Sequence, residues 1–81
     1  MAHHVYVLRC ADDTLYTGYT TDVDRRVDEH NEGQAAKYTR GRTPVELVHQ
    51  ETFETRSAAT SREAEIKAMT REEKLGLVGE A

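Results

Sequence analysis

The sequence predicts an α+β domain in which a three-stranded antiparallel sheet is flanked by helices, in the element order β-β-α-β-α-α. Two short runs rich in Val, Tyr, Thr and Leu flank a polar break at residues 11–14, which is typical of a β-hairpin. After Thr20 the apolar residues take helical spacing, with Val23 and Val27 one turn apart. A further apolar run follows Pro44 and helix caps follow that run, so one more strand and two more helices are expected.

The first strand is expected near residues 4–10 and is apolar on both faces. Its side chains alternate between two sets, Val5 and Val7 on one face and Tyr6, Leu8 and Cys10 on the other. A strand that is apolar on both faces is typical of the centre of a sheet that is covered on both sides. We therefore predict that this strand is the central one.

The second strand is expected near residues 15–19 and places Tyr16 and Gly18 on one face. Its other face carries Leu15, Thr17 and Tyr19. Glycine weakens a strand and often marks the close approach of a backbone or a ligand, so Gly18 is a candidate site residue.

The first helix is expected to begin after an N-cap at Thr21 or Asp22 and to end at Gly33. A polar loop without periodicity follows at residues 34–43, and its side chains include Lys37, Tyr38, Arg40 and Arg42. Thr43-Pro44 then favours an extended segment. In the third strand, expected at residues 45–53, Val45, Leu47 and His49 should share one face.

The second helix is expected to begin near residues 55–57 and to end near Met69, with an apolar stripe that includes Ala59 and Ile66. Thr70, with a glutamate at the third helical position, then forms a capping box. That box predicts a last short helix at about residues 71–77, which Gly79 ends.

Length and charge limit the classes of function. A chain of 81 residues predicts a single domain over residues 1–81. The formal net charge of −4 argues mildly against a protein that coats nucleic acid by bulk electrostatics, although a local basic patch would still bind it. The excess of acidic residues over lysine fits either a high-salt cytoplasm or a biased genome composition. Cys10 is the only cysteine and no apolar run could span a membrane, so we expect a cytoplasmic protein without a membrane partner.

Glu63 is the most informative residue of the second half. On a helix it lies four residues after Ala59 and three before Ile66, which places it on the apolar stripe. A carboxylate there is unfavourable unless a metal or another cation satisfies it. The alternative is that Glu63 only flanks the stripe and pairs with Arg62 or Lys67 at the surface, as charged helix residues commonly do.

Arg26 and His30 share one face of the first helix, beside its apolar residues. An arginine held next to an apolar stripe can point its planar guanidinium at a phosphate. Arg26 could equally pair with Asp22, and Arg25 is then the better candidate for a solvated residue.

Two tyrosines, Tyr6 and Tyr16, lie on predicted strands, where most tyrosines are core residues whose hydroxyl has one partner. A tyrosine that acts as a general base needs its phenol pKa lowered from about 10, and a nearby cation or metal-bound water could supply that shift. A zinc site has little support, because the sequence has no C-x-x-C or H-x-x-x-H spacing.

Over nearly the whole chain these residues together resemble the GIY-YIG nuclease superfamily. The family's motifs correspond to Val5-Tyr6-Val7, Tyr16-Thr17-Gly18, the helical R-x-x-x-H of Arg26 and His30, and the helical Glu63. Each tripeptide alone is weakly specific, whereas the ordered set at these spacings is strongly specific. The sequence departs from the family pattern at Val5, where the motif has glycine, and at Tyr19, where some members carry lysine.

The resemblance implies an endonuclease that cleaves DNA phosphodiester bonds with one divalent metal, Mg²⁺ or Mn²⁺. Carried over by position, Glu63 is the sole protein ligand of the metal and Tyr16 is the general base. Arg26 stabilises charge on the phosphate, and Tyr6 and His30 orient or assist.

The substrate implied is DNA, branched or single-stranded, with a protein partner possible for targeting. The residues expected to contact nucleic acid are Gly18, Tyr19, Arg25, Lys37, Arg40, Arg42 and Arg62. Binding through such a basic patch should weaken as salt rises. Two alternatives stay open, a nucleic-acid-binding module that does not cleave and a protein-interaction domain that depends on a partner.

Overall fold

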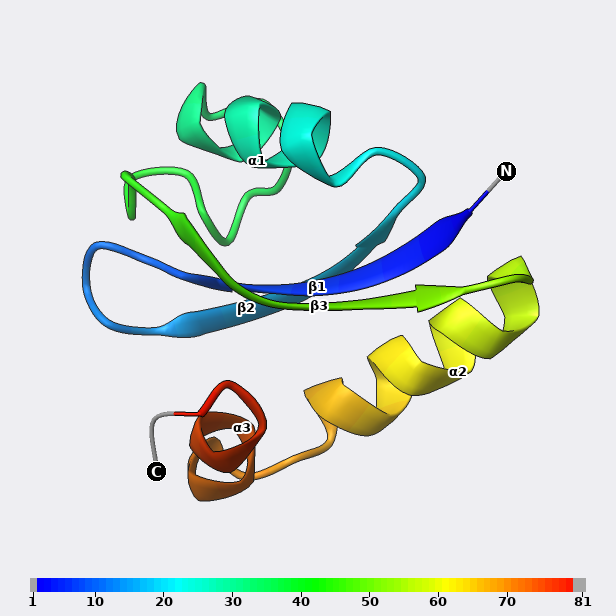
Figure 1. Cartoon of the computed structure of the whole chain (residues 1–81). Coiled ribbons are helices and arrows are strands. Elements are labelled where there is room, and N and C mark those ends of the chain that lie inside the picture. Colours follow the sequence, from blue (N-terminus) through cyan, green and yellow to red (C-terminus); the bar gives the residue numbers. More distant parts are fainter. Residues whose placement is uncertain (1, 80–81) are drawn as a thin grey trace.

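A computed structural model describes residues 2–79 and shows a three-stranded antiparallel sheet in the order β2-β1-β3 with three helices (Figure 1). In chain order the elements are β1 (His3–Arg9), β2 (Leu15–Thr20), α1 (Val23–Asn31), β3 (Glu46–Phe53), α2 (Arg56–Lys67) and α3 (Arg71–Leu77). This confirms the predicted α+β class and element order. Residue 1 and residues 80–81, the ends of the predicted domain, lie outside the described residues. Within residues 2–79 no helix combines the length and apolar character needed to cross a bilayer.

The two faces of the sheet are covered by different helices, with α1 on one side and α2 and α3 on the other (Figure 1). On the α2 side, Val5 and Val7 of β1 pack with Ala59 and Ile66, all four fully buried. On the α1 side, Tyr6, Leu8, Cys10, Val23 and Val45 form a second cluster. The prediction that the first strand is central and apolar on both faces is therefore confirmed.

One prediction for the third strand is wrong, because β3 carries a bulge. In the pairing with β1, Val7 lies opposite His49 while the next residue, Leu8, lies opposite Leu47. One extra residue of β3 thus separates two neighbours of β1, and a bulge of this kind moves the following side chains to the other face. Leu47 consequently shares the α1 side with Val45, whereas His49 lies on the α2 side.

Local capping signals set the ends of the helices as the sequence predicted. The side chain of Asp22 accepts a hydrogen bond from the backbone of Arg25 at 3.2 Å and caps α1. Gly33 follows the helix with a φ of +76°, a left-handed conformation that favours glycine. Thr55 caps α2, which ends at Lys67, two residues before the expected end. The predicted capping box at the start of α3 is present.

Gly18 is required by the ring of Tyr6, which lies across the neighbouring strand. The two residues are direct partners in the β1–β2 pairing. A Cβ atom on Gly18 would lie 2.5 Å from the Tyr6 hydroxyl oxygen and 2.6 Å from its Cζ atom. The sequence predicted a close approach at this glycine, and the group that fills the space is the Tyr6 side chain of the chain itself.

We expect Gly18→Ala to lower the free energy of unfolding by about 1–3 kcal/mol, because the buried Tyr6 ring has to move. Urea unfolding followed by circular dichroism measures the change. Gly76→Ala is the matched control: no atom lies within 4 Å of its added Cβ, and alanine in a helix should raise stability by about 0.5–1 kcal/mol. A Gly18→Ala variant as stable as the parent would mean that the Tyr6 ring does not require the absence of a side chain at residue 18.

Candidate active site

A buried chain of hydrogen bonds links β1, α1 and the loop that follows α1. The Tyr6 hydroxyl lies 2.8 Å from Nε2 of His30, and Nδ1 of His30 lies 2.8 Å from the Thr39 hydroxyl. The Thr39 hydroxyl in turn donates to the backbone oxygen of Ala36 at 3.1 Å. All three side chains are almost completely buried, with exposures of 2%, 1% and 0% respectively. The predicted pair of site residues Tyr6 and His30 is thus in direct contact.

The order of donors along this chain fixes the proton positions. Because the single hydroxyl proton of Thr39 is used for Ala36, Thr39 accepts from Nδ1–H of His30. Nε2 of a neutral imidazole is then the acceptor, and the Tyr6 hydroxyl donates to it. Burial lowers the pKa of His30, Arg26 lowers it further and Glu29 opposes them, which favours this neutral form.

Burial raises the pKa of the Tyr6 phenol far above its usual value, and charge on Tyr16 raises it further. Arg26 acts in the opposite direction, and the carboxylate of Glu63 adds to the increase. Tyr6 therefore remains a protonated donor, suited to orienting its neighbours and unsuited to acting as a base. Arg26 of α1 and Glu63 of α2 thus act on the pKa of Tyr6 in opposite directions.

Tyr16 lies on the same face of the sheet as Tyr6 and is half-buried. Its ring centroid is 5.0 Å from that of His30 in an edge-to-face arrangement and 6.3 Å from that of Tyr6. Register explains the placement, since Tyr16 pairs with Leu8 and Gly18 pairs with Tyr6. The predicted grouping of Tyr16 and Gly18 on one face of the strand is confirmed.

Arg26 projects from α1 with part of its guanidinium unsatisfied. Its Nη1 atom lies 3.6 Å from the Glu29 carboxylate, and its Nε atom is buried without a hydrogen-bond partner among residues 2–79. Arg26 therefore pairs with Glu29 rather than with Asp22, the partner that the sequence suggested. Arg26 lines a hollow of about 170 Å³, together with Thr20, Thr21, Asp22, Arg25 and Glu29. An unsatisfied guanidinium beside a hollow can accept an anionic ligand.

Glu63 is mostly covered, with a side-chain exposure of 19%, and its carboxylate lies 3.0 Å from the ammonium of Lys67 one helical turn away. This is one of the surface pairs that the sequence offered as the alternative to a metal. The ammonium is on a long side chain that is 55% exposed, and such helical pairs contribute only about 0.3–0.5 kcal/mol. A stronger cation could replace Lys67 at little cost.

No group of three or more His, Cys, Asp or Glu side chains suited to a metal occurs within residues 2–79. A cation that uses Glu63 would therefore draw most of its coordination from water and substrate oxygens. Mg²⁺ commonly binds in that way, through one or two carboxylates and several waters. The donor set around Glu63 fits a hard divalent cation and does not fit zinc, which prefers nitrogen and sulfur ligands.

The residues expected to contact nucleic acid lie in different places. Arg25 is 75% exposed beside Arg26, and the loop after α1 carries Lys37, Arg40 and Arg42. Arg62 is different, because its guanidinium makes three hydrogen bonds of 3.0–3.2 Å to Glu51 of β3, and these lower the pKa of that carboxyl. Tyr19 lies on the α2 side, where its hydroxyl is 2.6 Å from Nδ1 of His3. Neither Arg62 nor Tyr19 shares the face that carries Tyr16.

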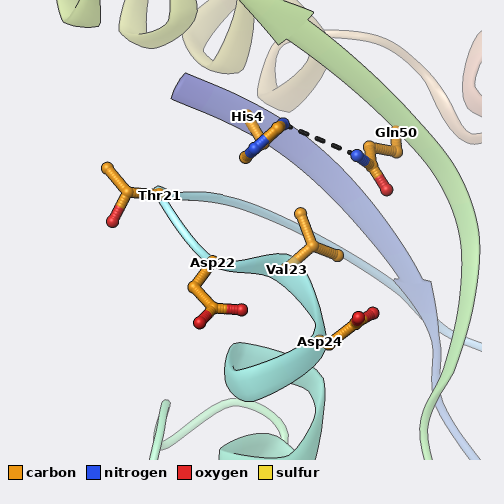
Figure 2. A pocket seen from close by; sticks show the side chains of 6 residues that line it. All are labelled: His4, Thr21, Asp22, Val23, Asp24 and Gln50. Atoms are coloured by element: carbon orange, nitrogen blue, oxygen red, sulfur yellow. Dashed lines mark hydrogen bonds between the residues drawn. The ribbon is translucent and has the colours of Figure 1, made fainter. Parts of the chain in front are cut away.

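A separate pocket of about 330 Å³ opens where the start of α1 meets the sheet (Figure 2). Figure 2 shows the side chains that line it, which are His4, Thr21, Asp22, Val23, Asp24 and Gln50. Its charged side chains, Asp22 and Asp24, are both acidic and would repel a phosphate, whereas in the other hollow Arg25 and Arg26 balance Asp22 and Glu29. The larger hollow is therefore the poorer candidate for a phosphodiester, and the hollow beside Arg26 is the better one.

Sequence reasoning missed two residues that hold the site together. Thr39 orients His30, but it lies in a loop without periodicity, and no local signal marks it. Asn31 joins the end of α1 to the start of β3, because its side chain accepts from the backbone N–H of Val45 at 2.7 Å and donates to the Val45 carbonyl at 3.4 Å. Asn31 directly follows the predicted R-x-x-x-H pattern, which was the available hint.

This arrangement of a three-stranded sheet, flanking helices and candidate site residues is that of a GIY-YIG domain. A profile of the GIY-YIG catalytic domain matches residues 2–75. The chain therefore belongs to the GIY-YIG family, as the sequence motifs predicted.

The chain's relatives are UPF0213 proteins. One from Haloquadratum walsbyi is 68% identical over 78 residues, which cover 96% of this chain and 88% of that protein. Another from Staphylococcus aureus is 56% identical over 79 residues, covering 98% of this chain and 96% of that protein. The solution NMR structure of a UPF0213 protein from Bacillus halodurans is similar with a TM-score of 0.63 at 50% identity, covering 96% of this chain and 83% of that chain.

The buried neutral His30 predicts a loss of stability in mild acid. A histidine whose pKa is lowered by folding binds its proton more readily in the unfolded chain, so stability rises with pH. The contribution of neutral His30 to the free energy of unfolding is complete above the pKa of histidine in the unfolded chain, about 6.5. As the pH falls from there through the lower pKa of the folded state, this contribution is lost by at most about 1.4 kcal/mol per pH unit.

Urea unfolding measured between about pH 5 and pH 8 tests this expectation, because the histidine titration falls in that range. His30→Gln should flatten the pH dependence. His4→Gln, which removes a histidine at the edge of the acidic pocket, is the control for loss of a histidine elsewhere. An equal slope in the parent and in His30→Gln would contradict the buried neutral state.

Proposed function

We propose that this protein is a metal-dependent endonuclease that hydrolyses DNA phosphodiester bonds. The observation that carries the proposal is that Tyr16, the Tyr6–His30 pair and Arg26, whose Nε is unsatisfied, lie on the α1 side of the sheet. Membership of the GIY-YIG family supports it, since that family is one of nucleases. Here a phosphate can meet a cation, Arg26, and a proton acceptor, Tyr16, beside the buried Tyr6–His30 pair.

Arg26 and Tyr16 divide the chemistry between them. The guanidinium of Arg26 binds a non-bridging oxygen and stabilises the negative charge that grows there. The Tyr16 oxygen accepts a proton from the attacking water. The water oxygen then forms a bond to phosphorus, the bond from phosphorus to the departing sugar oxygen breaks, and that oxygen leaves with its electron pair and takes up a proton from solvent.

Tyr6 and His30 act as positioning residues in this scheme. The hydroxyl of Tyr6 is locked by its hydrogen bond to His30, and the imidazole is locked by Thr39. The ring of His30 in turn contacts the ring of Tyr16 and limits where the Tyr16 oxygen can lie. Preorganised groups of this kind need no rearrangement when the transition state forms.

Glu63 is the proposed ligand of Mg²⁺ or Mn²⁺. The cation would exchange for the Lys67 ammonium on a carboxylate that is already mostly desolvated. Bound there, it would supply Lewis-acid stabilisation of the charge on the phosphate and on the departing oxygen.

DNA binding is proposed to rest on Arg25, Lys37, Arg40 and Arg42, which lie on α1 and on the loop after it. Such contacts release counterions, so affinity should fall steeply with salt. We place this activity in the cytoplasm, where a buried free thiol such as Cys10 stays reduced.

Two other functions remain as outcomes of the test. The Lys67 ammonium on Glu63 is the observation that favours a nucleic-acid-binding module without cleavage, because that carboxylate is already paired. The acidic net charge of −4 favours a domain that needs a protein partner to reach or activate its target.

The deciding experiment is cleavage of a labelled panel of single-stranded, duplex, flapped and branched DNA, with Mg²⁺ or Mn²⁺, at low and high salt. Cutting by the parent protein and not by Glu63→Gln, prepared in parallel, would establish the nuclease and its preferred DNA shape. DNA binding without cutting would select the binding module. If the parent protein neither binds nor cuts the DNA, the result favours the partner-dependent domain.

Glu63→Gln should abolish cleavage while leaving the fold and the DNA affinity nearly intact, because the amide has the same shape and cannot replace the charge that holds the metal. Single-turnover cleavage and fluorescence anisotropy measure the two effects separately. Glu65→Gln is the matched control on the same helix, with a side chain that is 66% exposed, and it should cleave normally. Equal loss of binding and cleavage in Glu63→Gln would argue against the metal role.

Tyr16→Phe should lower the single-turnover rate by ~10²-fold or more, the usual scale for loss of a general base. The ring contacts with His30 are kept in this variant, so its thermal unfolding should match that of the parent. A near-native rate at several pH values would remove Tyr16 from the role of base and leave it as a packing residue.

A further inference from the structure

The loop between α1 and β3 brings an exposed aromatic ring next to Tyr16. The ring centroid of Tyr38 lies 5.7 Å from that of Tyr16, with 32° between the ring planes. The guanidinium carbon of Arg42 lies 4.5 Å from the Tyr38 ring centroid. Tyr38 is nevertheless 43% exposed, the most exposed large hydrophobic side chain in residues 2–79. A tyrosine that serves only packing would bury more of its ring.

The loop that presents Tyr38 is fixed at several points. The next residue, Thr39, is fully buried and hydrogen-bonded to His30. The guanidinium of Arg42 forms an ion pair with Asp12 of the β1–β2 turn, and the Arg42 carbonyl accepts a hydrogen bond of 2.7 Å from the backbone of Ala11. Tyr38 and Arg42 are therefore held in place before any ligand arrives, which reduces the entropy lost on binding.

We propose that Tyr38 and Arg42 form a stacking site for an unpaired nucleobase next to the phosphodiester that is cut. This proposal rests on the proposed nuclease function and names a substrate feature that the same site reads. Tyrosine rings and arginine guanidinium planes are the surfaces on which proteins stack bases, with little dependence on base identity. Because Tyr38 contacts Tyr16, a base stacked there would carry its own phosphate next to Tyr16.

The stack also limits the form of the nucleic acid. A base inside a duplex has both faces covered by its neighbours, so it can stack on Tyr38 only after leaving them. The unpaired state removes that cost, and the site should favour a nucleotide that is already single-stranded or displaced at the position of cleavage. Arg40 and Lys37, on the same loop, can hold the adjoining phosphates without reading the bases.

The first test measures stacking without cleavage. An oligonucleotide that carries one unpaired 2-aminopurine is titrated with Glu63→Gln protein, and stacking on Tyr38 should quench its fluorescence. The double variant Glu63→Gln/Tyr38→Ala should lose the quenching and bind about tenfold more weakly or worse. Tyr38→Phe in the same background keeps the ring and should restore the quenching. Quenching that is unchanged by Tyr38→Ala would overturn the proposal.

The second test couples the protein side chain to one base of the substrate. A set of single-stranded substrates carries an abasic nucleotide at successive positions around the cleaved bond. At one flanking position the abasic change should slow cleavage by the parent about tenfold or more. Tyr38→Ala should cleave that abasic strand as fast as it cleaves the intact strand, because the stacking contact is already missing. Additive effects at every position would show that Tyr38 contacts no base and would overturn the proposal.

The two tests separate failure of this inference from failure of the nuclease function. If the parent cleaves DNA and Tyr38→Ala cleaves the intact strand and every abasic strand as fast as the parent does, the nuclease stands and the stacking site falls. If the parent does not cleave but 2-aminopurine is quenched through Tyr38, the nuclease falls and the base-binding site stands. If no oligonucleotide binds, both fall.

Discussion

The hydrogen bond between the Tyr6 hydroxyl and His30 is the interaction on which the rest of the site depends. It joins the central strand to α1, and through Thr39 it also joins them to the loop that carries the basic and aromatic surface. Buried polar groups are stable only when each has a hydrogen-bond partner. The chain of donors through Tyr6, His30 and Thr39 satisfies this condition in only one arrangement of protons. The histidine is held neutral, the tyrosine is held protonated, and the loop is held against the helix.

The sheet lies between two oppositely charged groups of the candidate site. Helix α1 brings the guanidinium of Arg26 to one face, and α2, packed on the opposite face, brings the carboxylate of Glu63 (Figure 1). The two groups act in opposite directions on the pKa of Tyr6, which shows that the field of each reaches it.

The parts of this structure that local chemistry determines were predictable from the sequence. The caps at Asp22 and Thr70 and the alternation that puts Tyr16 beside Gly18 each depend on residues a few positions apart. The bulge in β3 was not predictable, because it arises from pairing with a strand about forty residues earlier. Thr39 was missed for a related reason, since its role is defined by His30 across a loop without periodicity. The sequence motifs predicted which candidate site residues lie together, such as Tyr6 and His30, and did not predict the residues that hold them by tertiary contact alone.

The strand order has a consequence for synthesis on the ribosome. β1 leaves the ribosome first and can pair with β2 at once, but its other edge stays open until β3 emerges. Its α2-side face stays uncovered for longer still, because Ala59 and Ile66 come later in the chain. A nascent chain that exposes an unpaired apolar edge is prone to aggregate, so rapid translation of the second half would protect it. Glu63 is also made last among the proposed catalytic groups, so no growing chain carries a complete site before its sheet is closed.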